Sequence, residues 1–158
     1  MHSHRHRVLI AVTAALVIVS GRLLAAQDEV REKDPVLGAL DARVAQFLEA
    51  VSLGHSQSAF ADLLAGTQLR KQAEALKDLV ARTNDLEAKY GVFRAFEKVS
   101  AKRVGNDLVL MRYLYKCENF PVVWHFTFYR TPRSGETRAK TGAWRVVAVR
   151  FDTDLEQL

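Results

Sequence analysis

The 158-residue chain has few of the residues that build disulfide frameworks, metal centres or repetitive sequences. Its single cysteine excludes a disulfide framework and any zinc site built from several cysteines. Eight glycines and three prolines exclude collagen-like and proline-rich repeats, and a hydrophobic fraction of 49% argues against disorder. The chain is therefore long enough and apolar enough to bury the core of one domain.

A long hydrophobic run is also absent, although a short one lies near the N-terminus. Arg5 and Arg7 precede an uncharged, mostly apolar run of 13 residues from Val8 to Ser20. A spanning helix needs roughly 18 or more apolar residues, and Arg22 interrupts this run before that length. A basic start, a short apolar segment and small residues after it are typical of a secretory signal peptide. We therefore predict that residues 1–26 are cleaved and the protein is exported, periplasmic or secreted; an uncleaved N-terminal membrane anchor is the alternative.

Positive charge is abundant in the whole chain but not in the expected mature domain. The chain has 23 Lys+Arg and 18 Asp+Glu, and a net charge of +5 suits nucleic acid or an acidic membrane surface. Three arginines and no acidic residues lie in residues 1–26, so cleavage leaves 20 basic against 18 acidic residues, or +2. We expect no nucleic-acid partner, and a membrane partner only if the N-terminal segment is uncleaved. The spaced histidines His2, His4 and His6 leave with the same segment, and no other cluster indicates a metal or cofactor.

The domain is expected to begin with helices. Residues 27–34 are charged and aperiodic, which is typical of a flexible leader. Asp34 followed by Pro35 predicts a helix start, since aspartate caps a helix and proline lacks only an N–H that the first turn leaves unused. This amphipathic helix is expected to end near Gly54, and a shorter helix follows. Thr67 is expected to cap a third helix. The apolar positions of the first helix are Leu37, Leu40, Val44, Phe47, Leu48 and Val51.

After Gly91 the hydrophobic period changes from 3.6 to 2, which indicates strands. The segments are rich in valine, tyrosine, phenylalanine and tryptophan, which suit a half-buried pleated surface. A turn at 105–107 and a polar loop at 132–142 separate antiparallel neighbours. The single domain is expected to cover residues 35–152, with a tail at 153–158. The expected strands are 92–104, 108–118, 122–131 and 143–152.

Alternation within the second and third strands predicts their register. A short turn around Asn119 places odd-numbered residues of one strand beside even-numbered residues of the other. The second face would then bring together Arg112, His125 and Thr127. The core face would hold Tyr113, Tyr115, Cys117, Trp124 and Phe126.

The order of segments resembles a known superfamily. A helix ending in Lys89-Tyr90-Gly91 runs directly into a strand, and residues 142–151, GAWRVVAVRF, close the sheet. Over residues 35–152 the chain resembles small exported members of the nuclear transport factor 2-like (cystatin-like, cone-shaped) superfamily. The resemblance implies an α+β domain in which N-terminal helices pack on a curved four-stranded antiparallel sheet, with a pocket between them. Members include isomerases, dehydratases, ligand binders and dimerisation modules, so the fold alone does not decide the function.

Catalytic residues are scarce in the expected mature domain. His125 is the one candidate general base, but its predicted place beside Arg112 favours a structural or interface histidine. His55 lies in a helix-terminating turn and is expected on the surface. Cys117 would need a neighbouring base to act as a nucleophile, and we expect a buried small hydrophobe instead.

We therefore expect a non-enzymatic exported domain that binds a small apolar ligand or a protein partner. Tyr113, Tyr115 and Trp124 are the candidate ligand-binding residues, although an aromatic stripe at strand spacing is core in the first place. One alternative is a pocket acid–base enzyme, isomerase- or dehydratase-like, using His125. Another is a structural module that forms homodimers through the sheet. The candidate partner-binding residues are Arg112, His125, Thr127 and Tyr129.

Overall fold

The computed structural model describes residues 34–131 and 142–157. The expected signal peptide, nearly all of the expected leader and the expected loop at 132–141 lie outside the described residues. The chain divides into two parts, residues 1–38 and 39–158, and the fold below is that of the second part. Within the described ranges, none of the helices combines the length and the apolar character needed to span a membrane.

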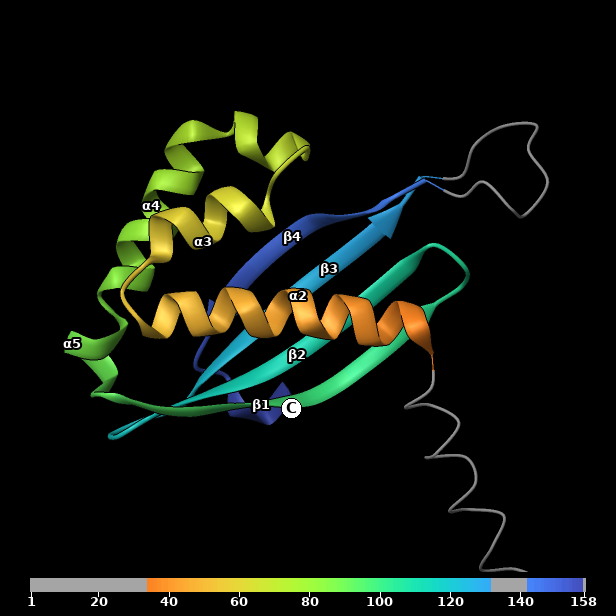
Figure 1. Cartoon of the computed structure of the whole chain (residues 1–158). Coiled ribbons are helices and arrows are strands. Elements are labelled where there is room, and N and C mark those ends of the chain that lie inside the picture. The colour runs from red at the N-terminus through yellow and green to blue at the C-terminus, as the bar shows by residue number, and fades with distance from the viewer. Residues whose placement is uncertain (1–33, 132–141, 158) are drawn as a thin grey trace, which may run out of the picture. The chain divides into compact units, whose positions relative to one another are not determined.

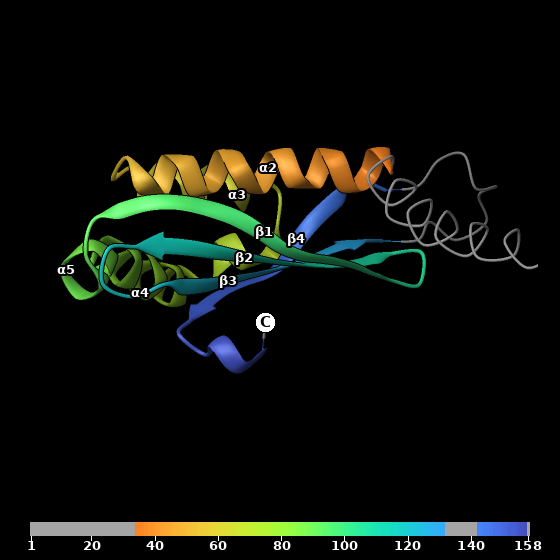
Figure 2. The same cartoon turned by 90° about the horizontal axis from the view of Figure 1, so that it is seen from below.

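Helices come first and a four-stranded sheet follows, which confirms the expected α+β class. The strands form one open antiparallel sheet in the order β1-β2-β3-β4 (Figure 1). Helix α2 runs along one face of the sheet, and the C-terminal η2 lies on the opposite side (Figure 2). The helical elements are α2 (Pro35–Ser52), α3 (Ser56–Leu63), η1 (Gln68–Lys71), α4 (Ala73–Asn84), α5 (Leu86–Tyr90) and η2 (Leu155–Gln157). The strands are β1 (Phe93–Val104), β2 (Leu108–Cys117), β3 (Val122–Arg130) and β4 (Trp144–Asp152).

Helix α2 begins and ends where its sequence predicts. The Val36 N–H donates to Asp34 Oδ1 at 2.9 Å, so Asp34 caps the helix and Pro35 is its first residue. Gly54, with φ of 79°, ends the last turn and its N–H donates to the Val51 carbonyl at 3.0 Å. The buried face consists of Leu40, Val44, Phe47, Leu48 and Val51.

The expectation that Thr67 caps the third helix is wrong. Its hydroxyl donates back to the Leu64 carbonyl at 2.8 Å, so it stabilises the end of the preceding turn instead. The 3₁₀ turn η1 intervenes, and α4 begins at Ala73 without a side-chain cap. The bend before β1 falls at Asp85, which separates α4 from α5.

The predicted register of the second and third strands is confirmed. Tyr113 of β2 lies opposite Trp124 of β3, and Arg112 lies opposite His125. β4 extends both of these cross-strand pairs, because Trp124 lies opposite Phe151 and His125 lies opposite Arg150. The parity that the sequence predicts therefore fixes which side chains enter the core.

Aromatic rings fill the space between α2 and the centre of the sheet. The Trp124 side chain is fully buried, and its ring centroid lies 5.3 Å from that of Phe47 and 4.7 Å from that of Phe151. Phe60 of α3 and Phe126 of β3 complete the cluster at centroid distances of 6.4 Å and 5.9 Å from Trp124. This cluster joins two helices, α2 and α3, to two strands, β3 and β4, that are distant from them in sequence.

Two polar side chains of α2 anchor the helix to its neighbours. Asp41 accepts a hydrogen bond from the Tyr113 hydroxyl and pairs with Lys98 Nζ at 3.1 Å, which ties the helix to β2 and β1. Arg43 donates to the carbonyl of Leu63 in α3 and, at 3.2 Å, to the carbonyl of Trp144 in β4. Helix α2 is therefore held at both edges of the sheet.

Candidate functional site

A cavity of about 240 Å³ lies where the helices meet the end of the sheet. The turn after α2, the junction of α4 and α5, the start of β1 and the end of β2 surround it. In Figure 1 this is the end of the domain where α5 leads into β1. The lining residues are Val51, Ser52, Gly54, Ser56, Thr83, Asn84, Leu86, Glu87, Gly91, Phe93, Tyr115 and Cys117.

Gly91 sets the geometry of this cavity. It joins α5 to β1 with φ of 88° and ψ of 176°, a conformation that side chains other than glycine rarely adopt. A Cβ here would lie 3.0 Å from both Asn119 Nδ2 and Glu118 Cβ. The Asn119 N–H also donates to the Tyr90 carbonyl at 2.9 Å, so the β2–β3 turn packs tightly on the glycine.

Aromatic and polar groups share the cavity wall. Phe93 and Tyr115 pack with ring centroids 4.5 Å apart at an interplanar angle of 36°. Burial raises the pKa of the Tyr115 hydroxyl above its usual range, and the charges of Cys117 and Glu87 raise it further. Tyr115 therefore stays a neutral phenol that can donate a hydrogen bond.

Cys117 is a protonated thiol in this setting. It is half-buried beside Phe93 of β1, and burial followed by the charge of Glu87 raises the pKa of its thiol. The thiolate needed for nucleophilic attack is disfavoured at neutral pH. Cys117 thus contributes a small polarisable surface to the wall.

The three candidate ligand-binding residues have different surroundings. Tyr115 lines the 240 Å³ cavity. Tyr113 is directed at Asp41 and packs edge-to-face on Phe126 at 6.0 Å, and Trp124 lies at the centre of the aromatic core. Neither Tyr113 nor Trp124 lines this cavity or the two further hollows described below.

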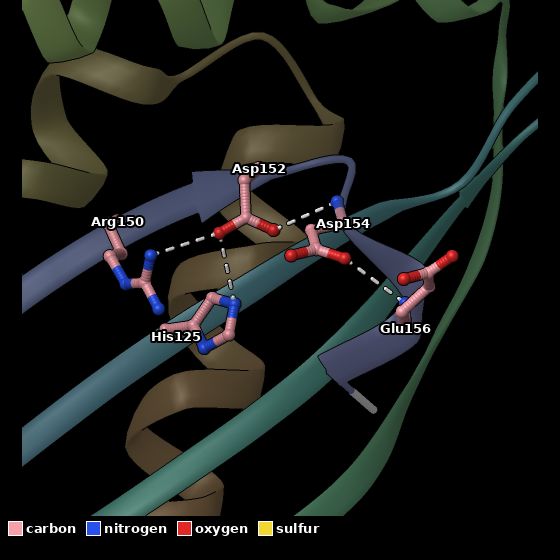
Figure 3. Close-up of polar contacts among 5 residues, drawn as sticks. All are labelled: His125, Arg150, Asp152, Asp154 and Glu156. Carbon is pink, nitrogen blue, oxygen red and sulfur yellow. Dashed lines mark hydrogen bonds and ion pairs between the residues drawn. The ribbon is translucent and has the colours of Figure 1, made fainter.

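His125 lies away from the cavity, in a charged cluster at the end of β4 (Figure 3). Its Nε2 atom is 3.3 Å from Asp152 Oδ2 but makes no hydrogen bond, and Arg150 Nη1 is 3.2 Å from the same oxygen. Burial and the charge of Arg150 lower the pKa of His125, and Asp152 opposes them. The Asp154 N–H donates to Asp152 Oδ1 at 3.1 Å, so Asp152 connects the sheet to the C-terminal turn.

This arrangement gives His125 little access to a substrate. Its side chain is only 12% exposed, and it lines none of the three cavities described here. A general base must reach a proton of the substrate directly or through one water. The side-chain contact of His125 is with Asp152 of the neighbouring strand, and Asp152 in turn binds the C-terminal turn.

The four candidate partner-binding residues gather on the sheet face opposite α2, which we call the outer face. Its cross-strand rows contain Arg112 with His125, Leu110 with Thr127, and Leu108 with Tyr129. The leucines of β2 are half-buried, and Tyr129 is 38% exposed. The charged members of the rows are Glu97, Lys102, Arg112, Arg145, Arg150 and Asp152.

Two further hollows lie elsewhere on the domain. One of about 490 Å³ lies between α4 and the edge strand β4, and its wall is mainly aliphatic. The other, of about 200 Å³, lies between α2 and α3, and His55 is on its rim. Within the described ranges, no group of three or more histidine, cysteine or acidic side chains is placed to hold a metal ion.

Neither a protein-family model, nor a curated protein, nor a solved structure matches this chain. The site is therefore interpreted from its own chemistry. Sequence reasoning missed Glu87, because a glutamate on a charged helix is indistinguishable there from a solvated surface residue. Its one signal was its place one turn before the Tyr90-Gly91 helix end, which directs α5 toward the start of β1.

Proposed function

We propose that the chain is an exported domain that binds a small molecule in the 240 Å³ cavity without catalysing a reaction. The observation that carries the proposal is the cavity itself, in which Tyr115 and Phe93 form an aromatic wall beside Glu87. Ligand sites combine an apolar or aromatic wall with a few polar groups, and this cavity has both. Ser56 and Thr83, both nearly fully buried, add polar side chains to its lining, and the Thr83 hydroxyl donates to the Leu79 carbonyl at 2.7 Å.

The order of elements also supports the proposed relationship to the nuclear transport factor 2-like superfamily. Among the described residues four α-helices precede four antiparallel strands, and the helix-to-strand junction falls at Gly91. In that superfamily a pocket between helices and sheet is the implied ligand site. Export is proposed from the basic and apolar pattern of residues 1–26.

Binding rather than catalysis is favoured by the state of the groups around the cavity. Cys117 is held as a thiol, and His125 lies elsewhere. Glu87 is an exposed carboxylate. The residues that line the cavity with it include no activated nucleophile and no second base. The wall can therefore orient a molecule but lacks a matched acid–base pair.

A cavity-filling variant tests the proposal. Small molecules screened by thermal denaturation should include some that raise the melting temperature, because a ligand at 100 times its Kd stabilises by about 2.7 kcal/mol. Cys117→Phe should fill the cavity and abolish these shifts, whereas Cys117→Ala, which leaves the space open, should retain them. Shifts that persist in Cys117→Phe, or a screen without any shift, would overturn the proposal.

A second candidate function, self-association through the outer face, is favoured by its apolar rows. Val104, Leu108 and Tyr129 form one row, and Val104 is 42% exposed. An antiparallel sheet with a solvated face is expected to carry polar residues there. The outer face instead carries leucines at positions 108, 110 and 114. Packing of this face against a second copy of the chain would remove their apolar area from water.

Salt should strengthen this association. Basic residues outnumber acidic ones on the outer face, so two copies repel each other until salt screens their charges. In sedimentation experiments the dimer fraction should rise with ionic strength. Leu110→Glu should abolish the dimer, and Leu53→Glu, at a site 66% exposed after α2, should not. A chain that stays monomeric at every concentration and salt level would exclude this function.

A further inference from the structure

We propose that the ligand of the 240 Å³ cavity is a small organic cation, a primary or quaternary amine, held by Glu87 and the aromatic wall. This inference rests on the proposed ligand-binding function and assigns the chemical class of the molecule. It is carried by the charge distribution around the cavity, the arrangement of the two rings and the volume available.

The charge of the cavity is negative. Glu87 is the single ionisable side chain with a full charge at neutral pH among the described residues that line it. The neighbouring cations are engaged elsewhere, because Lys89 pairs with Asp85 at 3.7 Å and Arg94 pairs with Glu118 at 2.7 Å. Glu87 also raises the pKa of both Tyr115 and Cys117, so its carboxylate acts on two other residues of the wall. A carboxylate or phosphate ligand would bring a second negative charge into this setting.

The aromatic wall suits the same class of ligand. Phe93 and Tyr115 both line the cavity, and their ring centroids lie 4.5 Å apart at an interplanar angle of 36°. Cations are attracted to the faces of such rings, and quaternary ammonium groups are recognised by aromatic surfaces of this kind. The raised pKa of Tyr115 keeps its ring a neutral phenol.

The volume limits the size of the cation. A cavity of about 240 Å³ has the volume of roughly eight water molecules at about 30 Å³ each. That volume accommodates a trimethylammonium group with a short tail, or a short alkylamine.

Three probes of matched shape separate charge from size. Choline, its neutral carbon isostere 3,3-dimethylbutan-1-ol and the anion 3,3-dimethylbutyrate are titrated into the purified full chain by calorimetry. We expect choline to bind about tenfold more tightly than the alcohol, which corresponds to about 1.4 kcal/mol, and the anion not to bind. Raising the salt concentration should weaken the binding of choline and leave that of the alcohol unchanged, because Glu87 is exposed to solvent and its charge is screened.

Variants then assign the effect to Glu87. Glu87→Gln should lower the affinity for choline about tenfold and leave the affinity for the alcohol unchanged, since the amide keeps the shape of the side chain and removes its charge. Glu49→Gln, on the exposed side of α2 and outside the cavity, is the matched control and should change neither. If choline and the alcohol bind equally well and Glu87→Gln changes neither affinity, the proposal that the ligand is a cation is overturned. The proposed ligand-binding function would then remain intact. Undetectable choline binding to the unsubstituted chain would overturn the cation class, whereas the wider screen with Cys117→Phe decides the proposed function separately.

Discussion

Replacement of Trp124 by alanine should lower the free energy of unfolding by about 3–5 kcal/mol, the largest single effect expected in this domain. The side chain is fully buried and its ring packs against Phe47 of α2, Phe60 of α3 and Phe151 of β4. Alanine would remove the contacts that join these elements, and the surrounding rings cannot collapse completely into the space. Urea denaturation followed by circular dichroism measures the change directly.

Trp124→Phe separates packing from polarity at the same position. The Nε1 atom of Trp124 is buried without a hydrogen-bond partner, so phenylalanine removes an unpaired donor as well as part of a ring. We expect the gain from removing the unpaired donor to offset part of the lost packing, so the free energy of unfolding should fall by less than about 1.5 kcal/mol. Phe120→Ala, at a ring 41% exposed, should also cost little. A Trp124→Ala variant as stable as Phe120→Ala would contradict the central place of this residue in the core.

Gly91→Ala is expected to lower the free energy of unfolding by about 2–3 kcal/mol for a different reason. A side chain at φ of 88° and ψ of 176° strains the backbone, and the new Cβ would meet Asn119 and Glu118 at 3.0 Å. The contact with Glu118 involves its Cβ, which cannot move without moving the strand end. Relief of the strain would shift α5 against β1, so the ligand binding that we propose for the cavity should weaken together with stability.

Gly105→Ala is the matched control for this prediction. Gly105 also has a positive φ, 61°, but a Cβ there meets nothing within 4 Å. Only the left-handed backbone conformation is then penalised, by about 1–2 kcal/mol. The excess loss in Gly91→Ala over Gly105→Ala measures the close packing of the β2–β3 turn. Equal losses in the two variants would show that this packing is not tight.

The fold class and the central register could be predicted because both depend on local, periodic patterns. The alternation around Tyr113 and Trp124 decides which side chains face inward, and a short turn leaves one register that pairs the apolar faces. The start of α2 could be predicted for the same reason, since Asp34 caps the first turn and Pro35 has no N–H that needs a partner there. The Thr67 cap was not predictable in this way. A threonine hydroxyl can donate to the turn before it or accept from the turn after it, and tertiary packing selects between them.

The residues that line the candidate site could not be predicted from the alternation of apolar and polar residues along the strands. Tyr113, Tyr115 and Trp124 share an inward face, yet α2 covers the first and third while Tyr115 lies where the helices diverge. Which inward residue borders a cavity is decided by the helix layer above it. Glu87 enters the site through the angle at which α5 meets β1, and Asp85 and Gly91 set that angle jointly.

The contacts of Arg43 have a consequence for the order in which the domain folds. Its guanidinium binds the carbonyl of Trp144, 101 residues later in the sequence. A chain that emerges residue by residue from the ribosome lacks this acceptor until β4 has been synthesised, so α2 docks late, as is general for contacts of high sequence separation. Arg43 therefore completes its contacts only once the strand that carries Trp144 has been made, however early the neighbouring helices form.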